Sequence, residues 1–73
     1  MTTFSLFITD KRYAIPTVAL IEAGDRTAAA MAAQTRLAES PHHEAIELYE
    51  DDRVFAFIDR EGVIWRNGEP EAV

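Results

Sequence analysis

The chain has 73 residues, which fits one domain, and is 48% hydrophobic and 27% charged. A domain of this size removes only about 60% of its unfolded surface from water and often needs a disulfide, a metal or oligomerisation. The absence of cysteine excludes disulfides and thiolate metal sites, so oligomerisation is the remaining common aid. The formal net charge of -6 disfavours nucleic acid as a partner, because phosphates attract lysine and arginine.

Neither membrane insertion nor secretion is expected from the sequence. The longest apolar runs are far shorter than the roughly 18 residues of a membrane-spanning helix. The first residues, MTTFSLFITDKR, lack the basic start and long apolar core of a signal peptide. We therefore expect a cytoplasmic protein.

The first part of the chain predicts two strands. Residues 3–9 alternate, so that Phe4, Leu6 and Ile8 share one side while Phe7 lies on the other. The polar residues 10–12 break this strand. Residues 17–22 predict a second strand after Pro16, which belongs at a strand start, an edge or a bulge because it cannot donate a ladder hydrogen bond.

Residues 26–39 predict a helix rich in alanine. Asp25 is a good N-cap, with Thr27 as an alternative, and Ser40 before Pro41 ends the helix. The polar residues do not gather opposite one apolar stripe, so the helix is weakly amphipathic. Alanine contributes little apolar area, and the sheet must therefore supply most of the large core side chains.

Residues 44–50 and 53–59 predict a hairpin that turns at Asp51-Asp52. This register places Leu48 opposite Phe55 and Ile46 opposite Phe57 on one core face. A loop at 60–62 would then add Val63 and Trp65 to that face, with a possible short fifth strand at 63–66. Residues 67–73 predict a frayed polar tail.

The same register predicts a second apolar face on the sheet. One helix can cover only one face, and a second copy of the chain is the simplest cover for the other. Two alternatives stay open: this face lies under the helix, or its exposed apolar groups are the single ones that most surfaces carry. The candidate interface consists of Phe7, Tyr49, Val54, Ile58 and Ile64, with Glu47 among them.

The candidate chemistry is confined to a few polar groups. His42-His43 is the only histidine pair, and it could serve a metal or acid–base site or be a solvated pair beside a helix end. Neighbouring strand residues point to opposite faces, so two adjacent imidazoles do not easily hold one ion. Glu50, Asp51 and Asp52 lack the spacing of a calcium loop and fit a solvated turn. We expect no catalytic residues, cofactor or metal.

Two segments resemble known families. The hairpin ELYEDDRVF, residues 47–55, is similar to the closing hairpin of small uncharacterised bacterial proteins with the order β-β-α-β-β. That resemblance implies a fold and brings no known activity. Gly24-Asp25-Arg26-Thr27 and the helix after it resemble the helix entry of HicB-type antitoxins, which implies a protein partner.

Together these patterns predict a single α+β domain over residues 1–73. An antiparallel sheet of four or five strands would carry one helix on one face, in the order β-β-α-β-β with the possible fifth strand. The leading functional hypothesis is a non-enzymatic homodimer that interacts through its second sheet face. The alternatives are an antitoxin-like regulator that binds a partner protein, and a ligand-binding or enzyme domain that uses His42-His43.

Overall fold

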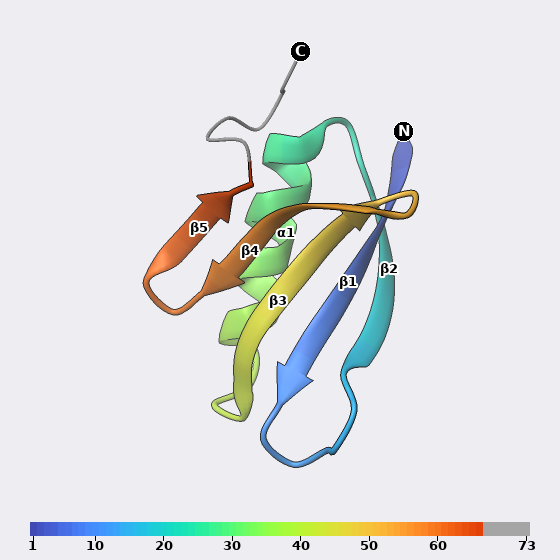
Figure 1. Ribbon diagram of the computed structural model, residues 1–73. Coiled ribbons are helices and arrows are strands. Elements are labelled where there is room, and N and C mark those ends of the chain that lie inside the picture. Colours follow the sequence, from blue (N-terminus) through green and yellow to red (C-terminus); the bar gives the residue numbers. More distant parts are fainter. Residues whose placement is uncertain (67–73) are drawn as a thin grey trace.

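The computed structural model describes residues 1–66 and confirms the predicted α+β architecture. A five-stranded antiparallel sheet carries one helix on one face (Figure 1). The tail predicted at 67–73 lies outside the described residues. The elements are β1 (Thr2–Asp10), β2 (Thr17–Ala23), α1 (Arg26–Ala38), β3 (His43–Glu50), β4 (Arg53–Asp59) and β5 (Gly62–Trp65).

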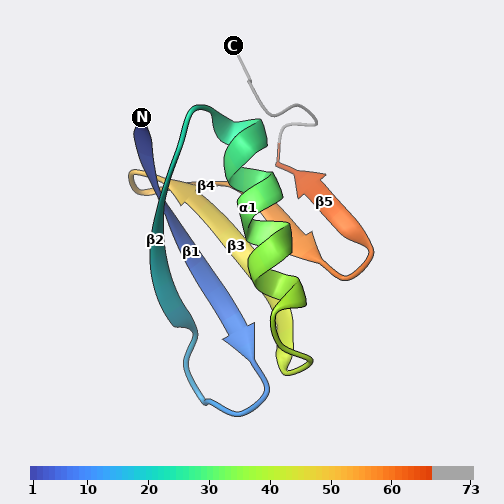
Figure 2. The same cartoon turned by 180° about the vertical axis from the view of Figure 1, so that it is seen from behind.

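The strands lie in the order β2-β1-β3-β4-β5. Hairpins join β1 to β2, β3 to β4 and β4 to β5. Helix α1 carries the chain from edge strand β2 across one face of the sheet to β3, which pairs with β1 on its other side (Figure 2). The connection places β3 in the middle of the sheet, where both of its edges are paired.

Helix α1 begins where the sequence predicts. The Asp25 carboxylate accepts a hydrogen bond of 2.8 Å from the Ala28 amide and so caps the first turn. The helix spans 13 residues, and it is neither long nor apolar enough to cross a membrane. Its buried stripe consists of Ala29, Ala30, Ala33 and Leu37.

The core lies between this stripe and the sheet. Because three of the four buried helix residues are alanine, the helix backbone can approach the strands closely. Most of the large core side chains accordingly come from the sheet, as predicted. Its fully buried large residues are Phe4, Leu6, Ile8, Ile46, Leu48 and Ile58.

A β-bulge in β4 corrects the predicted register of the β3–β4 hairpin. Tyr49 pairs with Val54 as predicted, but Leu48 pairs with Ala56 instead of Phe55. The extra residue reverses the alternation of the side chains in the rest of β4. Ile58 therefore lies in the core, and Phe57 points away from the helix. The predictions that placed Phe57 in the core and Ile58 in the interface were therefore wrong. Both assumed an uninterrupted ladder.

Strand β5 keeps the predicted faces in a different register. Val63 pairs with Ile58, and Trp65 pairs with Ala56. Both Val63 and Trp65 pack against the core, as the sequence predicts. The hairpin loop is one residue shorter than predicted because Gly62 already pairs with Asp59. This shorter loop offsets the extra residue of the bulge, and Val63 and Trp65 therefore stay on the helix side.

The bulge can be tested by truncating the two residues that it exchanges. Ile58→Ala should lower the free energy of unfolding by about 2–5 kcal/mol, because it leaves a cavity in the core. Phe57→Ala should cost much less, since Phe57 is already 38% exposed. Urea unfolding followed by circular dichroism, at a protein concentration low enough to keep the chain monomeric, measures both. A larger loss for Phe57→Ala would favour the uninterrupted register.

Candidate functional site

The face of the sheet opposite α1 is apolar and, within residues 1–66, carries no covering element (Figures 1 and 2). We call it the open face. Leu20 is 67% exposed, Ile64 60% and Val18 57%, which are high values for large aliphatic side chains. The apolar side chains come from all five strands. They are Phe7, Val18, Leu20, Tyr49, Val54, Phe57 and Ile64.

Strand pairing arranges the open face in two rows across the sheet. The first row runs from β2 to β5 as Val18, Phe7, Glu47, Phe57 and Ile64. The second row is Leu20, Ser5, Tyr49 and Val54. The rings of Phe7 and Tyr49 lie 4.9 Å apart between their centroids and link the rows. The rows make a continuous patch instead of scattered single residues.

The structure places four of the five predicted interface residues on this face. Phe7, Tyr49, Val54 and Ile64 share it, whereas Ile58 is fully buried under α1. Sequence reasoning missed Val18 and Leu20. Their strand is apolar on both sides, so alternation alone could not choose its inward face. The pairing of Val18 with Phe7 places Val18 on the open face, because paired residues point to the same side.

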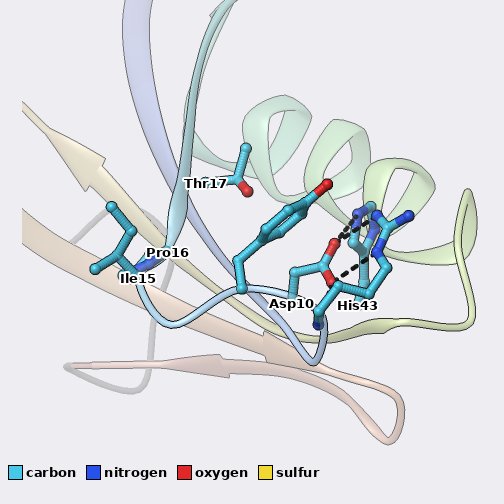
Figure 3. Close-up of a pocket in the computed structure, with 7 residues that line it drawn as sticks. Asp10, Ile15, Pro16, Thr17 and His43 are labelled. Carbon is cyan, nitrogen blue, oxygen red and sulfur yellow. Dashed lines mark hydrogen bonds and ion pairs between the residues drawn. The ribbon is translucent and has the colours of Figure 1, made fainter.

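A second candidate site lies at the turn between β1 and β2. A hollow of about 490 Å³ opens there beside the start of β3. Figure 3 shows Asp10 and His43 together at one side of the hollow and Ile15 and Pro16 at the other. The lining residues are Asp10, Arg12, Tyr13, Ile15, Pro16, Thr17 and His43.

Asp10 is the one charged residue among the buried residues of the described chain, with a side chain 2% exposed. The Arg12 guanidinium donates two hydrogen bonds to the Asp10 carboxylate, at 2.7 and 3.0 Å, and the Arg12 backbone amide donates a third at 2.9 Å. These bonds from Arg12 hold the pKa of the Asp10 carboxyl well below its usual value, against the opposing effect of desolvation. The carboxylate therefore stays charged inside the fold.

His43 connects this carboxylate to the end of the helix. Its Nδ1 lies 2.9 Å from the carbonyl oxygen of Arg36, which can only accept, so Nδ1 carries the proton. Its Nε2 faces the Asp10 carboxylate at 3.7 Å. Arg60 adds hydrogen bonds to the carbonyl oxygens of Ser40 and His43. The group ties the β1–β2 turn to the last turn of α1.

The surroundings of His42 and His43 can be compared with the hypothesis that this pair serves a metal, ligand or acid–base site. Both ring nitrogens of His43 are directed at groups of the fold, and the ring is only 13% exposed. His42 is exposed, so the two imidazoles lie in different surroundings. Among residues 1–66, no three His, Cys, Asp or Glu side chains are grouped to hold a metal ion. The arrangement acts as a structural clasp, which we call the Asp10 clasp.

A second hollow, of about 520 Å³, adjoins the open face where β3 and β4 turn. Tyr49 and Val54 form its apolar part. The charged residues that line it are Arg53, Arg66 and Asp52, two cationic and one acidic. The amide of Arg66 donates to the Phe55 carbonyl oxygen, which keeps Arg66 beside the bulge of β4.

Comparison with known proteins identifies no relative from which a function could be inferred. No protein-family model matches the sequence, and neither a curated protein nor a solved structure matches it.

The Asp10 clasp predicts a loss of stability in acid. The pKa of Asp10 is lower in the folded chain than its unfolded value near 4, so its stabilising contribution is complete above about pH 4 and is lost as the pH falls toward the folded-state pKa. Asp10→Asn should therefore be less stable than the wild type at pH 7 and lose less on further acidification. Urea unfolding at pH 7, 4 and 2.5, at one protein concentration, measures both effects.

Asp52→Asn is the matched control, because Asp52 is exposed at the β3–β4 turn. It should follow the wild-type acid dependence closely. If Asp10→Asn lost as much stability between pH 7 and 2.5 as the wild type, another carboxylate would carry the acid sensitivity.

Proposed function

We propose that this protein is a non-enzymatic interaction module of the cytoplasm that forms a homodimer through its open face. The observation that carries the proposal is the continuous apolar patch across all five strands. Contiguous apolar patches of this kind are uncommon on monomers and mark interaction surfaces. Aromatic residues, here Phe7, Tyr49 and Phe57, are also enriched at the centres of interfaces.

The size of the patch supports a second copy as the occupant. Five strands spaced at about 4.8 Å and about seven residues long present a face of roughly 500 Å² in projection. Small stable interfaces bury about 600–800 Å² of accessible surface on each partner. Accessible area exceeds projected area, so face-to-face packing of two sheets supplies an interface of the required order. The two sheets would then form a sandwich core between two outer helices.

The small helix-side core supports the same proposal. Alanine fills three of the four buried positions of α1, so the helix contributes little apolar area. A second apolar layer on the other side of the sheet would add burial that a chain of this length does not obtain alone. Dimerisation and folding stability would therefore be coupled, and the apparent stability would rise with protein concentration.

The dimer can be tested with a charge placed on the open face. Sedimentation equilibrium from about 1 to 200 micromolar should show the wild type changing from monomer to dimer. Phe57→Glu should raise the dissociation constant about 100-fold or more, because each interface would have to bury an unpaired carboxylate.

Met31→Glu is the matched control, since Met31 is 64% exposed on the outer side of α1 and lies away from the open face. It should leave the dissociation constant unchanged. A wild type that remains monomeric over the whole concentration range, with native circular dichroism, would overturn the proposal.

A further inference from the structure

Glu47 is the single acidic residue in the middle of the first row of the open face. Phe7 on β1 and Phe57 on β4 pair with it from either side. Tyr49 lies two residues further along the same strand and therefore on the same face. Among residues 1–66, no arginine, lysine or histidine forms an ion pair with Glu47. A partner that covers the two phenylalanine rings must also cover this carboxylate.

This position constrains how the open face can be covered. A carboxylate that loses water without gaining a cation is strongly unfavourable, whereas one that gains an arginine can recover the loss. A dimer centred on Glu47 would oppose two carboxylates across its symmetry axis. The two copies must therefore be offset, or the partner must supply a cation from elsewhere.

The chain has cations in a suitable place on the same surface. Of its seven lysine and arginine residues, four make polar contacts through their side chains within residues 1–66: Arg12, Arg26, Arg36 and Arg60. Lys11 lies at the distant β1–β2 turn. Arg53 and Arg66 remain, and both line the hollow beside Tyr49 and Val54 at one end of the open face. Because Arg53 pairs with Glu50, its side chain leaves β4 on the α1 side of the sheet, and Arg66 is therefore the arginine expected to carry the ionic contact. Two arginines against Asp52 give this hollow a net positive charge.

We infer that the second copy sits off-centre on the open face, so that Glu47 of each copy enters the hollow lined by Arg53 and Arg66 of the other. The inference rests on the proposed dimer and specifies its register and its ionic contacts. Two-fold symmetry makes every such contact occur twice, so the interface contains two equivalent ionic sites.

The offset also suits the apolar residues. Moving the symmetry axis from Glu47 toward the Tyr49 end of the face separates the two carboxylates. Tyr49 and Val54 then lie nearest the axis, and like side chains meet there without opposed charges. Arginine is suited to such a site because its planar guanidinium can bind a carboxylate through two parallel hydrogen bonds.

A charge exchange tests the register. Glu47→Arg and Arg66→Glu should each raise the dissociation constant at least about tenfold, because each places like charges at both ionic sites. The double variant should recover most of the wild-type affinity, since it restores opposite charges. Sedimentation equilibrium at constant ionic strength measures all three, and circular dichroism checks that each variant is folded.

Two further variants keep the test decisive. Glu44→Arg makes the same charge change at an exposed position of the same strand and should leave the dissociation constant nearly unchanged. Glu47→Gln removes the charge with little change of shape, so it remains usable if Glu47→Arg does not fold. It should weaken the dimer at least about threefold, because each arginine site loses its carboxylate.

The outcomes separate the register from the dimer itself. Single variants that dimerise as tightly as the wild type would overturn the inference, and so would a double variant no tighter than the weaker single one. If Phe57→Glu still dissociated the dimer, the proposed function would stand and only the register would fall. A monomeric wild type would overturn both.

Discussion

The structure depends on one imbalance, which is that a single helix covers a sheet with two apolar faces. Helix α1 contributes Ala29, Ala30, Ala33 and Leu37 to the core, and the sheet supplies every other large side chain there. The same strands still expose Val18, Leu20 and Ile64 on the other side. A two-layer domain buries one face of its sheet, and its second face must remain wet or meet a partner. In the proposed dimer, the second face meets the same face of another copy.

The bulge in β4 decides which side chains the second face carries. One extra residue places Phe55 and Ile58, three positions apart, on the same side. Phe57 moves to the opposite side and becomes paired with Glu47. The bulge thus gives the core a branched aliphatic residue and gives the open face an aromatic one, as bulges commonly re-aim side chains near functional surfaces.

The Asp10 clasp has a different role, because it joins elements that the sheet alone would leave apart. Asp10 at the end of β1, Arg12 in the turn and His43 at the start of β3 lie together, and the His43 ring reaches the last turn of α1. The polar groups satisfy one another, which a buried carboxylate requires. Chemistry-bearing residues therefore gather where the fold is tied together, at the far end from the Arg53–Arg66 hollow.

The sequence by itself determined the class of the fold, the order of its elements and the Asp25 cap, because these depend on local alternation, alanine content and capping chemistry. It also indicated a second apolar face and four of its residues. Tertiary structure alone decided the strand order, the bulge, the burial of Asp10 and the addition of Val18, Leu20 and Phe57 to the open face. The physical reason is that β2 and β4 are apolar on both sides. Their inward faces are set by the partner strands and by the space beneath α1, and neither is encoded within a single segment.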